Sequence, residues 1–428
     1  MNYQNTLEFA LQLDEQDPLK HLRDQFLFPK YNGQQAIYLC GNSLGLQPKA
    51  ARQYLQDQLN NWEDEAVEGW FRGKSPWLSY HKQLIAPLAR LLGAKPTEVT
   101  VMNSLTVNLH LLMVSFYKPT NKRFKILMEA GAFPSDQYAI ESQVRYHGYT
   151  QQQAVIEVSP RVGEFILRTE DIIQKIAEHA DELALVMFSG INYYTGQYFD
   201  LEAIAKAGHA AGAYVGFDLA HAAGNVEVKL HDWQADFACW CSYKYMNSGP
   251  GGISGVFVHQ KHFTDTTLNR FAGWWGYEHS KRFLMAPGFE PEVGAEGWNV
   301  STAPIMLMAL HKAALDVFEQ AGGLHPLRIK SENLTGYLEY LINDINARHG
   351  KHMLSIITPV NAKERGCQLS VVCKKNARDI FDYLASNGVI GDWREPDVIR
   401  LSPVPLYNSY TDVFKAAECL FKAITALN

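Results

Sequence analysis

The middle of the chain alternates short apolar runs with segments of helical periodicity, and this alternation constrains the fold more than any other feature. Between about residues 97 and 258, seven apolar runs have the length of strands, and amphipathic segments separate them. Such alternation predicts an α/β fold with a largely parallel sheet. The expected strands are Glu98–Met102, Phe124–Glu129, Ala154–Val158, Leu183–Phe188, Tyr214–Phe217, Phe237–Ser242 and Ile253–His259, and the expected helices are Thr106–Phe116, Ser135–Tyr146, Thr169–His179 and Leu201–Ala211.

The character of the chain changes after Gly323. With 428 residues, the chain is long enough for two domains with separate cores. We expect a large domain over residues 48–323 and a smaller α+β domain that combines residues 1–47 with residues 324–428. The small domain should contain a long helix (Pro326–Arg348), strands Leu354–Ile357 and Leu369–Cys373, a helix at Ala377–Ser386 and a closing helix from Tyr410.

Charge and composition exclude several classes of partner. A net charge of −6 and a pI near 6.2, without any basic run, argue against nucleic acid and anionic membranes. The amino terminus lacks the cationic start and apolar stretch of a secretory signal, and the longest apolar helical stretch, residues 304–318, is too short to span a bilayer. Six cysteines are few for this length, so we expect a reducing cytoplasm and no metal site.

Two of the expected strands lead to residues with useful chemistry. Asp218 follows Tyr214–Phe217, and Lys244 follows Phe237–Ser242 in the string Cys-Trp-Cys-Ser-Tyr-Lys-Tyr. Ligands of parallel sheets gather at the carboxyl ends of the strands. An amine and a carboxylate there suit pyridoxal phosphate (PLP), because the amine can bind its aldehyde and the carboxylate can keep its ring nitrogen protonated. An exposed loop lysine and a strand-capping aspartate are the ordinary alternatives for either residue alone.

Neighbouring segments favour the PLP interpretation. Tyrosines flank Lys244, and the glycine-rich stretch Asn247–Gly252 that follows lets backbone approach a ligand closely. The turn at Asn103-Ser104 precedes a helix whose free N–H groups could bind a phosphate. Tyr243 and Ser189 could add hydroxyl donors.

Four other features each allow two interpretations. His221 is either a buried core histidine or a neighbour of the cofactor, and Phe133 either stacks on an aromatic ring or belongs to the core. Arg400, in an apolar strand, needs a buried anion, which a substrate carboxylate and a structural salt bridge supply equally well. The loop Gly273-Trp274-Trp275-Gly276 favours contact with a ligand or a partner, since exposed aromatic side chains are costly.

The chain closely resembles kynureninase, a hydrolase family among the PLP enzymes of the aspartate-aminotransferase-like fold type I. The resemblance covers nearly the whole chain. It implies a large domain with a mainly parallel seven-stranded sheet, a smaller α+β domain and a homodimer. The matching strings are Tyr38–Pro48, Asn103–His110, Phe133–Asp136, Phe188–Gly190, Thr195–Gln197, Val215–His221, His231–Trp233, Cys239–Tyr245, Gly273–Gly276 and Pro403–Asn408.

The same resemblance implies roles for individual residues. Lys244 would hold PLP covalently, Asp218 would pair with the ring nitrogen and Tyr243 would donate a proton, and these three would be catalytic. The substrate carboxylate would bind Arg400, with Ser43 near the substrate and Trp70 facing its aryl ring. The rest of the cofactor site would comprise Leu105, Thr106, Phe133, Pro134, Ser135, Asp136, Ser189, His221, Thr302 (where some members carry asparagine) and Trp274 from the partner subunit.

The expected reaction is hydrolytic cleavage of the Cβ–Cγ bond of L-kynurenine, or of 3-hydroxy-L-kynurenine. It yields L-alanine with anthranilate or 3-hydroxyanthranilate, and it belongs to tryptophan catabolism and NAD biosynthesis. Another fold-type-I PLP enzyme, such as a cysteine desulfurase or an aminotransferase, is the alternative, although none of the six cysteines lies in an obvious glycine-rich loop. A catalytically silent relative that binds a partner protein is a third possibility, which the presence of Lys244 and Asp218 disfavours.

Overall fold

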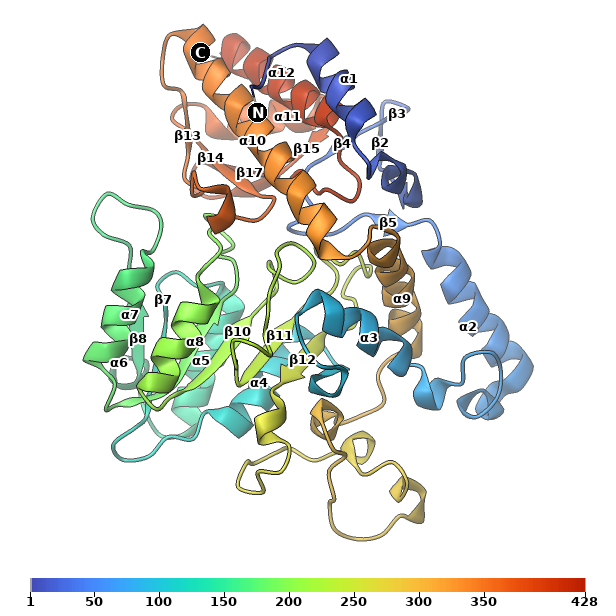
Figure 1. Cartoon of the computed structure of the whole chain (residues 1–428). Helices are drawn as coiled ribbons and strands as arrows, with labels where there is room; N and C mark the ends of the chain where they lie inside the picture. The colour runs from blue at the N-terminus through green and yellow to red at the C-terminus, as the bar shows by residue number, and fades with distance from the viewer. Residues whose placement is uncertain (1, 428) are drawn as a thin grey trace.

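The structure, a computed structural model, describes residues 2–427. Its largest element is a seven-stranded sheet with the strand order β6-β12-β11-β10-β9-β7-β8 (Figure 1). β12 is antiparallel to both of its neighbours, and the other pairings are parallel. The expected mainly parallel α/β sheet is therefore confirmed. Its strands are β6 (Val99–Val101), β7 (Lys125–Glu129), β8 (Val155–Val158), β9 (Leu183–Ser189), β10 (Tyr214–Asp218), β11 (Phe237–Trp240) and β12 (Gly255–Val258).

Helices cover both faces of this sheet because both faces are apolar. Successive residues of β9 point to opposite sides: Val186 and Phe188 join one buried cluster with α7 and α8, and Leu185 and Met187 join another with α4 and α5. Strands buried on both faces read as continuous apolar runs, which is why the sequence located them. The helices are α4 (Leu105–Phe116), α5 (Pro134–Tyr146), α6 (Gln151–Ala154), α7 (Thr169–Glu178) and α8 (Leu201–Ala210).

The strand expected at Phe237–Ser242 is wrong at its end, because β11 stops at Trp240. The hydroxyl of Ser242 bonds to Ser248 and to the carbonyl of Ile253 instead of continuing the ladder. Residues 241–244 therefore do not continue the strand but form a bend at the edge of the sheet.

A second, antiparallel sheet lies in the C-terminal part of the chain, with the order β13-β14-β17-β16. α1, at the start of the chain, packs beside α12 at its end (Figure 1). Ala10, Leu13 and Leu39 join the apolar core of this region. The N-terminal segment and the C-terminal part therefore share one core. The elements are α1 (Leu7–Gln16), α10 (Leu324–His349), α11 (Ala377–Ala385), α12 (Tyr410–Leu427), β13 (Leu354–Ile356), β14 (Leu369–Cys373), β16 (Asp392–Arg394) and β17 (Val398–Leu401).

In the described part of the chain, three short strand pairs and several helices lie outside the two main sheets. β4 (Ile37–Tyr38) pairs in parallel with β15 (Val389–Ile390), β1 (Phe26–Leu27) pairs with β5 (Gln47–Pro48), and β2 (Lys30–Tyr31) pairs with β3 (Gln34–Gln35). Helices α2 (Ala51–Glu65), α3 (Lys82–Leu91) and α9 (Ile305–Gln320) pack together. The short 3₁₀ helices are η1 (Lys20–Gln25), η2 (Ala66–Trp70), η3 (Trp77–Ser79), η4 (Pro96–Glu98), η5 (Gln260–His262), η6 (Trp274–Gly276), η7 (Arg282–Leu284), η8 (Ala295–Trp298) and η9 (Ala362–Glu364).

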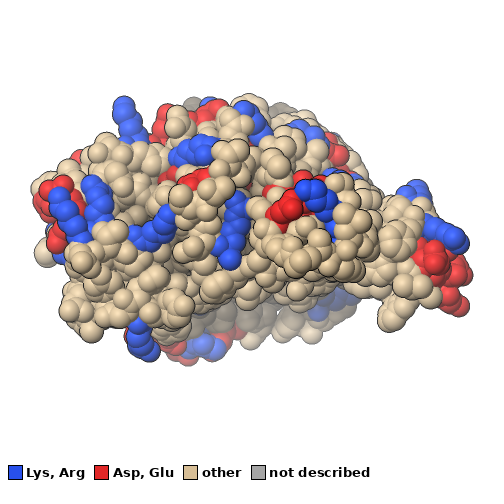
Figure 2. All heavy atoms as spheres, turned by 90° about the horizontal axis from the view of Figure 1, so that it is seen from below, with Lys and Arg blue, Asp and Glu red and all other residues tan. Residues whose placement is uncertain are grey.

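The surface carries no broad patch of one charge on the face seen from below, where basic and acidic side chains are interspersed (Figure 2). Among residues 2–427, no helix combines the length and the apolar character that crossing a bilayer requires.

Asp236, just before β11, is a buried carboxylate that ties several elements of the large sheet together. Its oxygens accept hydrogen bonds from the backbone N–H of Val215 at 2.6 Å and from the rings of His209 and His262 at 2.9 and 2.8 Å, and Lys261 lies 2.7 Å away. Burial alone would raise the pKa of Asp236, but these donors and the Lys261 charge hold it below its usual range. The carboxylate is thus charged and fully paired in the folded protein.

Replacing Asp236 with alanine should lower the free energy of unfolding by about 3–5 kcal/mol, because the buried partners lose their anion. Urea unfolding of the cofactor-free protein near neutral pH measures this loss. Since the folded pKa lies below the unfolded value, the contribution is present above the unfolded pKa and disappears as the pH falls, so the two proteins should converge in acid. The exposed Asp181, 3.8 Å from Lys122, provides the control; an equal loss in Asp181→Ala would contradict the prediction.

Candidate active site

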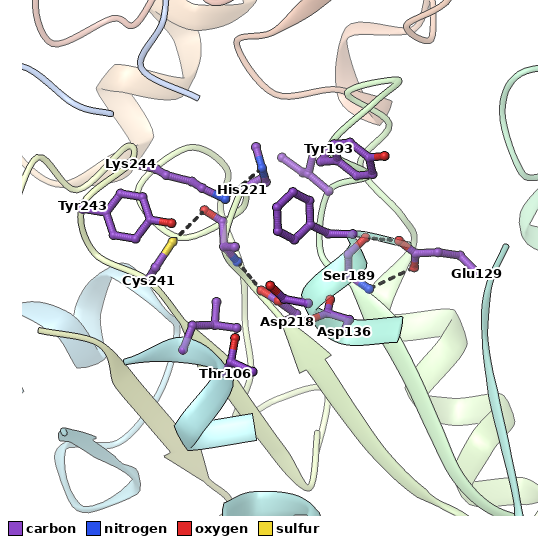
Figure 3. Close-up of a pocket in the computed structure, with 15 residues that line it drawn as sticks. Thr106, Glu129, Asp136, Ser189, Tyr193, Asp218, His221, Cys241, Tyr243 and Lys244 are labelled. Atoms are coloured by element: carbon purple, nitrogen blue, oxygen red, sulfur yellow. Dashed lines mark hydrogen bonds between the residues drawn. The ribbon is translucent and has the colours of Figure 1, made fainter. Parts of the chain in front are cut away.

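A cavity opens to solvent at the carboxyl ends of the parallel strands, with a volume of about 520 Å³ when the space open to solvent is counted. Its walls come from the ends of β7, β9 and β10, the first turns of α4 and α5, and the segment after β11 (Figure 3). The lining residues are Leu105, Thr106, Glu129, Phe133, Ser135, Asp136, Ser189, Ile191, Tyr193, Asp218, Ala220, His221, Cys241, Tyr243 and Lys244.

Lys244 is 9% exposed and points into this cavity toward His221 (Figure 3). Its Nζ lies 3.0 Å from Nε2 of His221 and 5.6 Å from the ring centre of Phe133. Burial, and then the charges of Lys244 and two nearby arginines, lower the pKa of His221 well below its usual value. His221 is therefore neutral at pH 7, and its Nε2 can accept a hydrogen bond from the amine. Its Nδ1 is buried and makes no hydrogen bond within the described residues.

Two carboxyl groups, Asp218 and Asp136, lie side by side on another wall (Figure 3). Asp218 ends β10 and accepts a hydrogen bond from the N–H of Ala220 at 2.6 Å. Burial, and then the charge of Asp218, raise the pKa of Asp136 well above its usual value. Burial also raises the pKa of Asp218, although the N–H of Ala220, the charge of Lys244 and a hydrogen bond from Asp136 oppose the rise. Asp136, with the stronger rise, therefore keeps its proton and donates it to Asp218, while its Oδ1 is buried without a partner in residues 2–427. The pair offers one negative charge and one free acceptor to a ligand.

The first turn of α4 forms a third wall. Ser104 occupies its N-cap position with an extended backbone but makes no side-chain capping bond. The N–H groups of the first turn, which includes Leu105 and Thr106, can therefore bind an anion. The hydroxyls of Ser189 and Tyr243 line the same cavity.

Glu129, which sequence reasoning treated only as the end of a strand, also lines the cavity. It is 1% exposed and accepts hydrogen bonds from the N–H of Ser189 at 3.0 Å and from the Ser189 hydroxyl. Burial raises the pKa of Glu129 to about 7, against the opposing effect of the Ser189 hydrogen bonds. The sequence did contain a signal for Glu129: like Asp218, it is a carboxylate directly after an apolar run.

A Glu129→Gln variant should respond differently to pH. Because the folded pKa of Glu129 is raised, the folded protein keeps a proton that the unfolded chain releases between pH 4.5 and about 7, and stability falls as the pH rises through this window. From about pH 5 to about pH 8, the cofactor-free wild type should lose about 2.5 kcal/mol more than the variant. Chemical unfolding at the two pH values measures this difference, and parallel losses in both proteins would refute it.

Arg400 lies in β17, outside the cavity lining but next to it. It is fully buried, with Nε 3.1 Å and Nη2 2.8 Å from the carboxylate of Asp392. Its Nη1 donates to the carbonyl of Tyr193 at 2.6 Å, and Tyr193 lines the cavity. The salt bridge that the sequence left as one alternative is therefore present.

This salt bridge does not use the whole guanidinium. Asp392 engages the edge formed by Nε and Nη2, and Arg394 adds a second positive charge 3.0 Å from the same carboxylate. Two arginines and one aspartate leave one net positive charge for an anionic ligand. Ser43 belongs to this group, because its hydroxyl bonds to Asp392 and lies 3.4 Å from Nη2 of Arg400.

Ten of the residues expected at the cofactor site line the cavity, and the others lie elsewhere in the single chain. Pro134 begins α5 between lining residues. Trp70 packs against Trp77 and Trp275, with ring centres 5.6 and 5.9 Å apart. Trp274, 46% exposed, contacts Trp275 and Phe283, and Thr302 precedes α9. Sequence reasoning did not anticipate the lining residues Glu129, Ile191, Tyr193, Ala220 and Cys241, nor Asp392 beside Arg400.

Solved structures of similar shape identify the fold. A cysteine desulfurase from Thermococcus onnurineus matches 97% of this chain and 98% of its own, with a TM-score of 0.76 and 18% identity. A C-DES variant with glycine covalently linked to its PLP cofactor matches 90% of this chain and 96% of its own, with a TM-score of 0.73 and 14% identity. At such low identity these similarities show the fold alone, which is the expected fold type I.

Sequence relatives are far more similar. The family described as the kynureninase C-terminal domain matches residues 327–420. Proteins named kynureninase from Flavobacterium psychrophilum and Flavobacterium johnsoniae are 54% and 53% identical over 424 residues, which is 99% of this chain and 99% of each relative. Identity at this level over the full length is specific, and the chain belongs to the kynureninase family.

Proposed function

We propose that this chain catalyses the PLP-dependent hydrolysis of L-kynurenine, or of its 3-hydroxy form, to L-alanine and anthranilate or 3-hydroxyanthranilate. The observation that carries this proposal is the 54% identity to a protein named kynureninase over 99% of both chains. The desulfurases of similar shape share the fold at only 14–18% identity. The reaction belongs to the kynurenine pathway of tryptophan catabolism, from which 3-hydroxyanthranilate enters NAD biosynthesis.

The polar groups of the cavity fit PLP. Its phosphate would bind the first turn of α4 with the hydroxyls of Ser189 and Tyr243, and its ring nitrogen would face Asp218 and the free Oδ1 of Asp136. Lys244 is the only lysine among the residues that line the cavity. The ring centre of Phe133 lies 5.6 Å from its Nζ, so the Phe133 ring could stack on a cofactor ring bound to this amine. When bound, PLP supplies an electron sink for the carbon that loses its proton.

Side chains of the cavity would carry out the proton transfers of the reaction. The Lys244 amine, held 3.0 Å from neutral His221, is placed to take the proton from the substrate's α-carbon. Asp218, which accepts a hydrogen bond from the protonated Asp136, would pair with the ring nitrogen and keep it protonated. Burial raises the pKa of Tyr243, so its hydroxyl stays protonated and can donate to the product as alanine forms. Arg400 would hold the α-carboxylate and so orient the reacting carbon.

We also propose a homodimer in which Trp274, Trp70 and Thr302 complete the partner's site. The segment 271–293 lies on the side of the large domain away from the small domain (Figure 1). It exposes apolar side chains that a monomer has no reason to present to water, among them Phe271, Trp274, Phe283, Leu284, Met285 and Val293. Mass photometry should give twice the 48.3 kDa chain mass, and a monomer at micromolar concentration would contradict this assembly.

Two further expectations complete the proposal. The domain limits, residues 48–323 against residues 1–47 with 324–428, are supported by the shared core of α1 and α12. A reducing compartment such as the cytoplasm is supported by the six cysteines, all of which are free.

Incubation with kynurenine tests the function. Purified protein with PLP, but without any added keto acid, should release anthranilate, seen by its fluorescence, and an equal amount of alanine. An aminotransferase would need the keto acid, and a desulfurase would release sulfide from cysteine. Sulfide without anthranilate would overturn the proposal, and the relative turnover of kynurenine and 3-hydroxykynurenine would define the preferred substrate.

A further inference from the structure

A short loop, Cys40–Gly45, joins the part of the structure that carries Arg400 to the segment that carries Lys244; we call it the bridging loop. It follows β4, which pairs with β15. At its start, the carbonyl of Leu39 accepts the N–H of Ser402 at 2.8 Å, and Cys40 forms a β-bridge with Ser402. The loop is therefore attached to the chain directly after β17, the strand of Arg400.

The middle of the bridging loop contacts the arginine itself. The Ser43 hydroxyl donates to Asp392, whose carboxylate pairs with Arg400, and the same hydroxyl lies 3.4 Å from Nη2 of Arg400. A turn holds Ser43 in place, since its N–H donates to the carbonyl of Cys40 at 3.0 Å.

The end of the bridging loop packs against the segment that carries Lys244, residues 243–247. The N–H of Gly45 donates to the carbonyl of Tyr243 at 2.8 Å. A Cβ at Gly45 would lie 2.3 Å from the carbonyl oxygen of Lys244 and 2.8 Å from Cα of Asn247, so any larger residue must push this backbone aside. The hydroxyl of Tyr38 donates to the carbonyl of Leu44 at 2.7 Å and fixes the approach.

We propose that the bridging loop is a positioning element that fixes the spacing between Arg400 and Lys244. The inference rests on the proposed function, because an α-amino acid substrate must reach both groups at once. Its carboxylate is one bond from the α-carbon whose proton Lys244 would take, yet Arg400 lies in β17 of the second sheet and Lys244 follows β11 of the large sheet. A misplacement of about 1 Å between such groups can lower the rate about 10²-fold. Ser43 and Gly45 act through their neighbours, which makes them positioning residues.

The test compares two variants that disturb the bridging loop with one control; one variant is in the loop and the other is at Tyr38 in β4, whose hydroxyl donates to the loop, and both are called loop variants below. Gly45→Ala adds a methyl group against the backbone of Lys244 and should lower kcat about 10²-fold, and Tyr38→Phe removes one hydrogen bond and should lower kcat about fivefold. Gly336→Ala, on α10 in the small domain, is the matched control, because the three atoms nearest to its Cβ all belong to the side chain of Tyr3, whose hydroxyl oxygen would lie 2.7 Å away. It should retain the wild-type kcat.

Two readouts other than activity separate positioning from a general loss of structure. In cofactor-free protein, hydrogen exchange of peptides covering residues 40–48 and 241–248 should accelerate about fivefold or more in both loop variants and stay unchanged in Gly336→Ala. In the loaded enzyme, the apparent pKa of the visible absorption band should shift by about half a unit or more in Gly45→Ala. If Gly45→Ala does not fold, the activity and the hydrogen exchange of Tyr38→Phe still test the inference.

Wild-type kinetics and wild-type exchange in the loop variants would overturn the inference, as would a loss of activity with unchanged exchange at residues 241–248. These outcomes are distinct from a failure of the proposed function, in which the wild-type protein itself would not turn over kynurenine.

Discussion

Replacing Lys244 with alanine is expected to remove the visible absorption band of lysine-bound PLP and to lower kcat at least about 10³-fold. The side chain is 9% exposed in a cavity whose other lining residues include no lysine, so no neighbour can replace its amine. With the proposed roles of Lys244, the variant would lose both the covalent attachment point and the base near the α-carbon. Absorption spectra and steady-state anthranilate release measure the two losses.

A surface lysine provides the control for this variant. Lys122 is exposed and lies 3.8 Å from Asp181, away from the cavity lining. Lys122→Ala should keep the spectrum and the turnover of the wild type. If Lys244→Ala kept more than a few per cent of wild-type turnover, the roles assigned to this amine would be wrong.

An Arg400→Lys variant should raise KM for kynurenine about 10–100-fold while leaving the affinity for PLP nearly unchanged. Lysine keeps the charge but cannot hold Asp392 along one edge and a carboxylate along another, as the planar guanidinium can. Arg400 does not line the cofactor cavity, so the absorption spectrum should not change. Steady-state kinetics and PLP titration separate the two effects.

The purely structural alternative makes a different prediction. If Arg400 served only as the partner of Asp392, Arg400→Lys would lower stability without raising KM selectively. Arg378→Lys is the matched control, since that arginine is exposed on α11 and bonds Asp382. A KM that changes no more in Arg400→Lys than in Arg378→Lys would exclude the carboxylate role.

Residues close to a strand end were predictable from the sequence. Asp218 and Ser189 close β10 and β9, and both strands are continuous apolar runs that any buried parallel strand shows. Because parallel strands present their carboxyl ends at one edge of the sheet, their meeting in one cavity followed from the pattern. Lys244 was found through its own string of neighbours, although β11 ends four residues earlier.

Residues that depend on long-range pairing were not predictable. Asp392 lies directly opposite Arg400 in the pairing of β16 with β17, and β16 has only three residues. So short a strand has no recognisable periodicity, and its register depends on the neighbouring strand. Tyr193 reaches Arg400 through a backbone carbonyl, which any residue type provides, so its side chain gave no signal. Trp70, Trp274 and Thr302 do not line the cavity of the single chain, and only the proposed homodimer would bring them to a site.

The site at which the cofactor is covalently attached is tested most directly by mass spectrometry of the PLP-loaded enzyme after borohydride reduction and proteolysis. Our account predicts one pyridoxyl-phosphate modification, on the peptide that contains Lys244. A modification confined to another lysine, or an unmodified Lys244 in protein that turns over kynurenine, would contradict it.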